Sequence, residues 1–239
     1  DYEYLENFGI QEVPHKKYLN DFLTGKYPDS FARGELYNDD PRLGDARLCG
    51  TTASLCGIER FGFEGNQEGV DRAVRYDITL HAFMLSQSGI PVIYSGDEIG
   101  QVNDYTYKDD PKKADDSRYL HRGNFDWKLA ENRHDPTTVQ GKLFPALDKL
   151  EHIRTSHGVF NSNVPFHTID TWDNSILAFV RENDEEKFIG IYNFSENNKV
   201  AWINEEDGMY TDLISGRELE AKGVQIPAFG CYWLCRSKK

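Results

Sequence analysis

The chain has 239 residues, of which 38% are apolar, 13% aromatic and 28% charged, a composition typical of a folded protein and not of a disordered one. Forty acidic residues against 27 basic ones give a formal net charge of −13. Long-range repulsion therefore disfavours nucleic acid and anionic membrane surfaces as partners. No apolar run in the sequence approaches the ~18 residues that a membrane span requires, so a membrane protein is not expected.

The first region, residues 1–66, is rich in residues that favour turns. Glycine, aspartate and asparagine recur in stretches such as SFARGELYNDDPRLGDARLCG, so long regular elements are not expected there. One short helix is predicted near His15 to Leu23, where apolar residues recur at helical spacing.

The second region, residues 67–158, has the pattern of a helix followed by a strand. An apolar stripe from Val70 to Leu85 predicts a helix that ends by Gly89, and Pro91 prevents its continuation. The stretch GIPVIYSGDEIG at 89–100 is apolar without alternation, which is typical of a strand covered on both faces in a parallel sheet or barrel.

A long polar loop then runs from 101 to about 134, before a second helix. Asp135 and Pro136 offer an N-cap and a first-turn proline for that helix. Pro145 lies inside its apolar stripe, so the helix is expected either to kink there or to start late.

The third region, residues 159–239, switches to a period of two. Its short alternating runs predict an antiparallel β-sandwich, with turn signals such as NEEDG at 204–208 between them. The runs are SILAFVRE, KFIGIYNFS, KVAWIN, MYTDLIS and VQIPAFGCYWLCR. Trp172, Trp202 and Trp233 lie in apolar alternation and are expected in the core, which argues against a stand-alone carbohydrate-binding module with an aromatic platform.

The cysteines, at 49, 56, 231 and 235, do not predict disulfides or a metal site. Cys231 and Cys235 would lie about 13 Å apart on one face of a strand, too far for a bond or a shared ion. Four reduced thiols indicate a cytoplasmic protein. His15, His81 and the other histidines considered, His121 and His134, have no mutual metal spacing, so neither a metal nor a cofactor is expected.

The strand at 89–100, with a helix before it and a helix and a β-sandwich after it, resembles the eighth strand of the (β/α)8 barrel of the α-amylase superfamily. The pattern G-x-P-x-x-Y-x-G-x-E, which recurs at that strand in the superfamily, is matched from Gly89 to Glu98. A narrower resemblance, to the amylosucrase family, runs along most of the chain. It rests on SFARG (30–34), GDARLCGTTASLCG (44–57), SGDEIGQVND (95–104), DDSRYLHR (115–122), NRHDPTT (132–138) and YNFSEN (192–197).

The resemblance implies a fold and a division into domains. Residues 1–66 would be an insertion after the seventh barrel strand that forms part of the acceptor surface. Residues 67–158 would be the last helix, strand, loop and helix of a TIM barrel, and 159–239 a C-terminal antiparallel β-sandwich. The chain would thus be a C-terminal fragment of a longer enzyme, with Asp1 just after the seventh strand.

Amylosucrases are retaining glucosyltransferases that split sucrose and elongate an α-1,4-glucan, so sucrose and glucan are the expected partners. Retaining chemistry needs a nucleophile and a general acid about 5 to 5.5 Å apart. In the family both acids, and a third in a His-Asp-Asp stretch, lie on strands that would precede Asp1. We therefore expect no catalytic residue here and an inactive chain. Asp97 and Glu98 are consecutive and point to opposite faces of a strand, so they are expected to rim the pocket or cap a turn.

Four expected binding residues come from the same resemblance. Arg118, in DDSR, matches an arginine that closes the bottom of the glucosyl pocket with an acid; alternatively it bridges Asp115 or Asp116 on its own loop. Arg47 matches an arginine that contacts acceptor sugars. Lys16 and Tyr18 match outer acceptor positions, where the family is expected to have arginine and phenylalanine, so the preferred glucan length is open. The alternative for Lys16 and Tyr18 is a solvated helix face.

Asn103 and Asp104 are expected to rim a sugar site, because amide and carboxylate groups bind hydroxyls; an ordinary exposed loop is the alternative. A sucrose hydrolase, an α-glucosidase or an α-amylase of the same superfamily shares these motifs and remains an alternative function. A lone apolar strand without neighbours is expected to expose barrel surface, so self-association through residues 70–100 is also expected.

Overall fold

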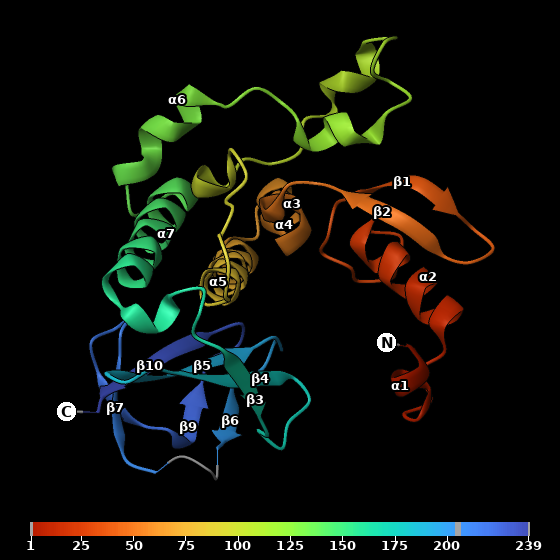
Figure 1. The fold of residues 1–239 in the computed structure, drawn as a ribbon. Helices are drawn as coiled ribbons and strands as arrows, with labels where there is room; N and C mark the ends of the chain where they lie inside the picture. The colour runs from red at the N-terminus through yellow and green to blue at the C-terminus, as the bar shows by residue number, and fades with distance from the viewer. Residues whose placement is uncertain (1, 204–206, 239) are drawn as a thin grey trace. The chain divides into compact units, whose positions relative to one another are not determined.

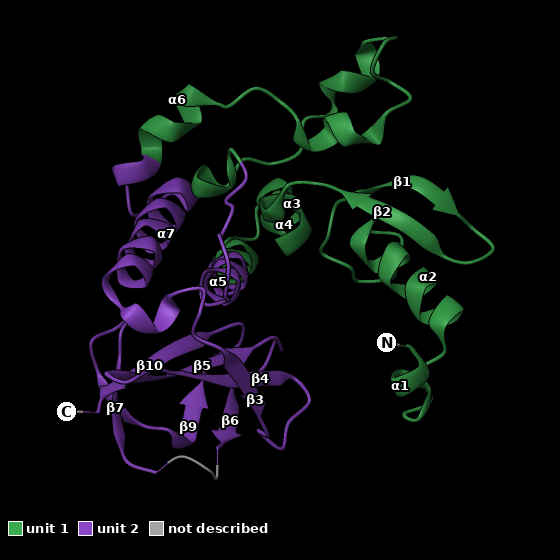
Figure 2. Cartoon of the chain, in the orientation of Figure 1, with its two compact units in different colours: residues 1–74, 95–132 green, residues 75–94, 133–239 purple. Residues whose placement is uncertain are grey.

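The computed structural model describes residues 2–203 and 207–238, and the chain divides into two compact units (Figure 2). Unit 1 comprises residues 1–74 and 95–132, and unit 2 comprises residues 75–94 and 133–239. The boundaries expected at 66 and 158 do not coincide with these units. Asp1 and the first residues of the turn expected at 204–208 lie outside the described residues.

Unit 1 is built from short elements (Figure 1). They are α1 (Tyr2–Glu6), α2 (Glu12–Leu23), β1 (Glu35–Asp40), β2 (Asp45–Cys49), α3 (Thr52–Cys56), α4 (Ile58–Phe63), the first part of α5 (Gln67–Leu85), η1 (Asp97–Ile99), η2 (Tyr105–Asp109), η3 (Ser117–His121) and α6 (Trp127–Ala130). The helix predicted near His15 to Leu23 is confirmed as α2. The rest of the segment is more regular than expected, because ELYNDD and DARLC pair as antiparallel strands across a tight turn at Gly44, where φ is +71°.

The strand expected at 89–94 is not formed, whereas the helix before it, α5, is confirmed. Residues 90–94 run without helix or strand structure, and no strand in the described ranges 2–203 and 207–238 pairs with them. Ile90 is 92% exposed and Val92 is 76% exposed. A strand is completed only when neighbouring strands take up its backbone N–H and C=O groups, and this segment has no such neighbour.

The second predicted helix is present as α7 (Val139–Ser156), but its cap differs from the prediction. Thr138 is the N-cap, and its Oγ1 accepts the Gly141 N–H at 3.0 Å. Asp135 instead accepts the Thr137 N–H at 2.9 Å in the preceding turn. The helix therefore begins at Val139 and contains Pro145, so the late start expected from that proline is wrong.

Unit 2 contains the antiparallel strands expected after residue 159. They are β3 (Phe166–Ile169), β4 (Ile176–Glu182), β5 (Glu186–Asn193), β6 (Lys199–Trp202), β7 (Met209–Asp212), β8 (Glu218–Glu220), β9 (Lys222–Ile226) and β10 (Cys231–Ser237). Six of them form one sheet in the order β3-β4-β5-β10-β7-β8, and β6 pairs with β9 in a separate two-stranded sheet. Two 3-10 turns, η4 (Glu131–His134) and η5 (Gly158–Phe160), flank α7.

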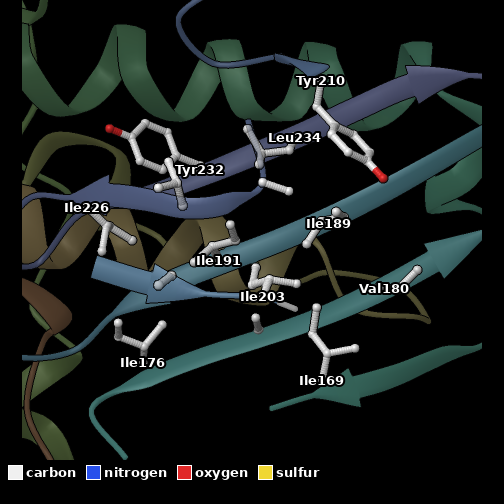
Figure 3. Close-up of a cluster of buried hydrophobic side chains, with 14 residues drawn as sticks. Ile169, Ile176, Val180, Ile189, Ile191, Ile203, Tyr210, Ile226, Tyr232 and Leu234 are labelled. Atoms are coloured by element: carbon white, nitrogen blue, oxygen red, sulfur yellow. The ribbon is translucent and has the colours of Figure 1, made fainter. Parts of the chain in front are cut away.

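Each face of the six-stranded sheet buries its own apolar cluster. One face packs against β6 and β9 around Ile189, Ile191, Ile203 and Ile226 (Figure 3). The other face packs against α5 and α7, with Leu85, Leu147 and Trp233 fully or almost fully buried. Consecutive strand residues point to opposite faces, so the alternating sequence supplies both clusters at once.

The core position expected for three tryptophans holds for Trp233 alone. Trp172 is 73% exposed and Trp202 is 52% exposed. Trp172 lies in a turn before β4 with a φ of +58°, and Trp202 lies at the end of the short strand β6. The prediction from alternation that Trp172 and Trp202 lie in the core is therefore wrong. The four cysteines are free, and no described helix is both long and apolar enough to cross a bilayer.

Candidate functional site

The candidate site in unit 1 is one face of the β1–β2 hairpin and the loop segments that pack on it. The strand register places Tyr37 opposite Arg47 and Glu35 opposite Cys49. Directly opposed residues share a face and have Cβ atoms about 4.5–5.5 Å apart. These four side chains therefore lie on the same face of the hairpin.

Arg118, from η3, stacks on this face. Its guanidinium carbon lies 4.4 Å from the centre of the Tyr37 ring. Its Nε donates to Asp116 Oδ1 at 2.8 Å and its Nη2 donates to Asp116 Oδ2 at 2.7 Å. The Arg118 side chain is still 41% exposed, so the planar group is held by two bonds and one ring and keeps an outward edge.

The Asp116 carboxylate pairs with the positive charge of Arg118 and orients its guanidinium. Its Oδ1 also accepts the Arg118 backbone N–H at 3.0 Å, which caps the start of η3. The Arg118 guanidinium lowers the pKa of Asp116 to about 2. The pair is therefore ionised at neutral pH. The structure thus shows the bridge between Arg118 and Asp116 on their own loop that the sequence analysis gave as the alternative.

Glu35 anchors the neighbouring 3-10 turn to the hairpin. It accepts hydrogen bonds from the Tyr107 hydroxyl and from Lys108 Nζ, the latter at 2.5 Å. Burial, and then the bond to Glu35, raise the pKa of Tyr107 well above its usual value. Ser117 Oγ donates to the Leu36 carbonyl at 2.9 Å, so η2 and η3 are both tied to β1.

Asn103 holds the base of the same loop. Its side-chain oxygen accepts the Thr51 N–H at 2.9 Å, its backbone N–H donates to Ser54 Oγ at 2.9 Å, and its amide nitrogen donates to the Arg33 carbonyl at 2.5 Å. Asn103 is buried. Each of these bonds is internal to the fold, so Asn103 supports the loop that carries the site.

The three predicted acids Asp97, Glu98 and Asp104 lie in turns. Glu98 Oε2 accepts the Gly96 N–H at 2.8 Å. Asp104 Oδ1 accepts the Thr106 N–H at 2.9 Å and caps η2. Asp97 is buried and opens η1. Glu98 and Asp104 thus hold their own turns.

Lys16 and Tyr18 lie on α2, beside the start of β2. Lys16 Nζ donates to Asp45 Oδ1 at 2.6 Å and to Glu12 Oε1 at 2.5 Å. The bond to Asp45, and then that to Glu12, raise the pKa of Lys16. Tyr18 is partly exposed and packs edge-on against Tyr27, with ring centroids 4.9 Å apart.

A polar hollow of about 390 Å³ separates α2 from the hairpin. It is lined by Lys17, Asn20, Asp21, Lys26, Leu36, Asp39, Asp40, Pro41 and Gly44. Amides, carboxylates and ammonium groups of this kind bind hydroxyls, so the hollow suits a hydroxylated ligand; its lining does not include Lys16 or Tyr18.

The structure stacks Arg118 on Tyr37, which lies opposite Arg47 in the hairpin register, and it leaves Asn103, Asp104 and Glu98 in supporting roles. Tyr37 and Glu35 were not singled out from the sequence. ELYNDD has no apolar alternation that would have predicted a strand, so only the observed strand β1 puts both residues on one face. Two guanidinium groups beside an aromatic ring can stack on a sugar ring and donate to hydroxyl or anionic oxygens.

Comparison with known proteins identifies the broad class. No protein-family model matches the chain. The sequence is 28% identical over 166 residues to glucosylglycerate phosphorylase of Escherichia coli strain K12. The matched region covers 69% of this chain and 28% of that protein. The chain is thus similar in sequence to part of a carbohydrate-active enzyme.

Solved structures share the fold over about two thirds of the chain. Trehalulose synthase MutB from Pseudomonas mesoacidophila has a TM-score of 0.50 at 20% identity, covering 67% of this chain and 38% of that one. AmyP, solved with maltotriose, has a TM-score of 0.54 at 16% identity, covering 68% and 35%. The chain thus spans well under half the length of each relative named here.

Proposed function

We propose that this chain is the C-terminal part of a retaining α-glucosyltransferase that cleaves sucrose and passes glucose to an α-1,4-glucan through a covalent glucosyl-enzyme. The sequence motifs that resemble amylosucrase support this, as do the superfamily relatives. The observation that carries the proposal is the stacking of Arg118 on Tyr37 directly beside Arg47.

The arrangement of the two arginines fits the two binding roles that the resemblance implies. Arg118 would hold the glucosyl ring that is transferred, and Arg47 would bind the sugar that accepts it. Sugars on the two sides of a reacting bond are immediate neighbours, so their binding groups must also be neighbours. Opposition of Arg47 to the ring on which Arg118 stacks supports this arrangement.

We further propose that the catalytic acids come from the part of the enzyme outside this chain, and that the chain alone does not split sucrose. Glu98 and Asp104 accept hydrogen bonds from nearby backbone N–H groups in their own turns. A retaining pair must instead present two carboxyl groups about 5 to 5.5 Å apart toward one bond. The short coverage of the curated relative, 28% of its length, is consistent with this view.

A phosphorylase is the second candidate, because the curated relative is named glucosylglycerate phosphorylase. In that reaction phosphate would take the glucosyl group that a glucan hydroxyl takes in the first proposal. Guanidinium groups bind phosphate and carboxylate oxygens well, so Arg47 and Arg118 suit either acceptor.

Product analysis of the protein encoded by the complete reading frame separates the candidates. It would be given sucrose with glycogen, sucrose with phosphate, and glucosylglycerate with phosphate. A transferase releases fructose and lengthens glycogen, a phosphorylase forms glucose 1-phosphate, and a hydrolase forms free glucose. Failure to release fructose from sucrose in any mixture would refute the first proposal.

Variants of the same protein test the two arginines. Arg118→Lys keeps the charge but not the planar fork, and we expect a roughly 10²-fold loss of kcat/KM for the glucosyl donor. Arg47→Ala should raise KM for the acceptor and leave donor cleavage in the absence of acceptor unchanged. Arg42→Ala is the matched control, because Arg42 is exposed on the same hairpin and pairs with Asp40 at 2.9 Å.

A further inference from the structure

A cluster of metal-binding groups lies in unit 2. His157 follows the last residue of α7, Glu186 opens β5 and Cys235 lies in β10. One ligand atom of each residue lies within 4.8 Å of the others. These three residues come from distant parts of the sequence and are named here the His157 cluster.

The strand register explains why Glu186 and Cys235 meet. Cys235 lies opposite Phe188 in the antiparallel pair of β5 and β10. Glu186 is two residues before Phe188, so it shares the face of Cys235 as a diagonal neighbour. Phe188 is fully buried, which fixes this part of the sheet.

The position of His157 is fixed by the turn that follows it. Val159 and Phe160, in η5, are buried in the apolar cluster that also contains Phe188. His157 Nδ1 lies 2.5 Å from Glu186 Oε1, and the Val159 N–H donates to Glu186 Oε2 at 3.3 Å. The backbone at all three ligand positions is thus held by buried neighbours, as a binding site requires.

We propose that the His157 cluster binds one zinc-class ion through His157, Glu186 and Cys235, with water as the fourth ligand. Imidazole nitrogen, carboxylate oxygen and thiolate sulfur are the donors that Zn²⁺ takes in four-coordinate sites, whereas Ca²⁺ and Mg²⁺ prefer oxygen alone. Zinc bonds of about 2.0–2.3 Å put tetrahedral ligand atoms roughly 3.3–3.7 Å apart. Side-chain rotations that move the ligand atoms by roughly 1 Å bring the cluster to that geometry.

The surroundings favour a cation and give it access. His157 directly follows the C-terminal end of α7, where the helix dipole is negative. The side chains of His157 and Glu186 are 27% and 21% exposed, so an ion can enter from solvent. Cys235 is buried. Burial, and then the nearby Glu186 charge, raise the pKa of the Cys235 thiol to about 12, so the ion itself must displace the thiol proton on binding.

A bound ion would join the end of α7 to two central strands of the sheet. The role is therefore structural, and it does not depend on the activity proposed for unit 1. The competing explanation is an ordinary His157–Glu186 ion pair beside an inert thiol, and it predicts that Cys235 never contacts a metal.

Titration of the purified, metal-free chain with Co²⁺ and then Zn²⁺ tests the proposal. We expect one equivalent to bind, with the near-ultraviolet charge-transfer band of a cobalt–thiolate bond, and Zn²⁺ to displace the cobalt. Cys235→Ser should abolish the band, while His157→Gln and Glu186→Gln should each weaken Zn²⁺ binding by at least about tenfold. Circular dichroism would check that each variant is folded.

Two matched controls separate the cluster from incidental binding. His152→Gln removes an exposed histidine that lies 3.4 Å from Asp148, a two-ligand surface pair, and should change nothing. Cys231→Ser removes the other thiol of β10 and should leave the band intact. Absence of a thiolate band in the parent chain, loss of the band in Cys231→Ser, or equal Zn²⁺ affinity in all variants would each overturn the proposal.

Discussion

Arg181, in β4, is completely buried and binds carbonyl groups, which makes its replacement a sharp test of the packing in unit 2. Its terminal nitrogens donate to the carbonyls of Ser86 at 2.9 Å, Asn161 at 2.7 Å and Val164 at 2.9 Å. Its Nε is buried without a hydrogen-bond partner in the described part of the chain. Burial lowers the pKa of Arg181.

Arg181→Met keeps the apolar stem and removes the donors. The Asn161 carbonyl still accepts the Val164 N–H and the Val164 carbonyl still accepts the Ser88 hydroxyl, so the loss is that of three hydrogen bonds to a charged group. Each such bond contributes about 1.5–3 kcal/mol, and three contribute about 4.5–9 kcal/mol. Removing a buried charge returns part of this, because the guanidinium no longer has to be desolvated. We expect the free energy of unfolding to fall by about 3 kcal/mol, a large part of the 5–15 kcal/mol typical of a folded domain.

Urea unfolding followed by circular dichroism measures this change. The free energy of unfolding of Arg181→Lys should lie between those of the parent chain and Arg181→Met, because one ammonium cannot span three separated carbonyls. Arg217→Met, at an exposed position, is the control and should shift stability by less than about 0.5 kcal/mol. If Arg181→Met were as stable as the parent chain, desolvation would outweigh the hydrogen bonds and the reasoning would be wrong.

Three further changes follow from the structure. Gly141→Ala would place a Cβ 1.9 Å from the Asp135 carbonyl oxygen, so we expect a loss of about 2 kcal/mol or more in urea unfolding. Hydrogen bonds from the Ser175 hydroxyl and from Lys199 lower the pKa of Asp173 from 3.8 to about 2 in the folded chain. The stabilising effect of the Asp173 carboxylate is therefore complete above pH 3.8 and is lost as the pH falls toward about 2, which acid unfolding of Asp173→Asn measures. Ile90→Glu, in the exposed segment 90–94, should reduce concentration-dependent association in sedimentation equilibrium.

Each of these has an outcome that would contradict it. Gly62→Ala is the control for the glycine change, because nothing lies within 4 Å of its added Cβ and alanine should stabilise helix α4 by about 0.5–1 kcal/mol. Equal behaviour of the two glycine variants would remove the steric argument. An acid transition unchanged by Asp173→Asn would contradict the prediction for Asp173. A parent chain that is monomeric at all concentrations would contradict the prediction for Ile90.

Local patterns were enough for the elements that have a strong period of their own. The stripe from Val70 to Leu85 predicted α5, and alternation after residue 159 predicted the antiparallel strands, because side-chain periodicity reports directly on the face that is buried. The caps were less certain. Asp135 and Thr138 are both good N-cap residues, and the choice between them depends on which backbone N–H groups each one reaches.

Part of the candidate site also followed from the sequence. Arg118 and Arg47 were named from their motifs, and Asp116 was an expected partner of Arg118. The sequence did not show that Arg118 stacks on Tyr37 or that Tyr37 lies opposite Arg47, since this depends on the docking of η3 and on the register of β1 against β2. Asn103 was expected at a sugar site and is instead a buried support, because its partners come from residues about 50–70 positions away.

The sequence by itself determined helices α2, α5 and α7, the antiparallel strands after residue 159, the net charge and the resemblance to amylosucrase, since all of these depend on residue identity and on neighbours along the chain. Tertiary structure alone decided that residues 90–94 join none of the described strands, that Trp172 is exposed, and that His157 meets Glu186 and Cys235. In each of these cases the outcome depends on groups far away in the sequence, and a local pattern carries no information about where those groups lie.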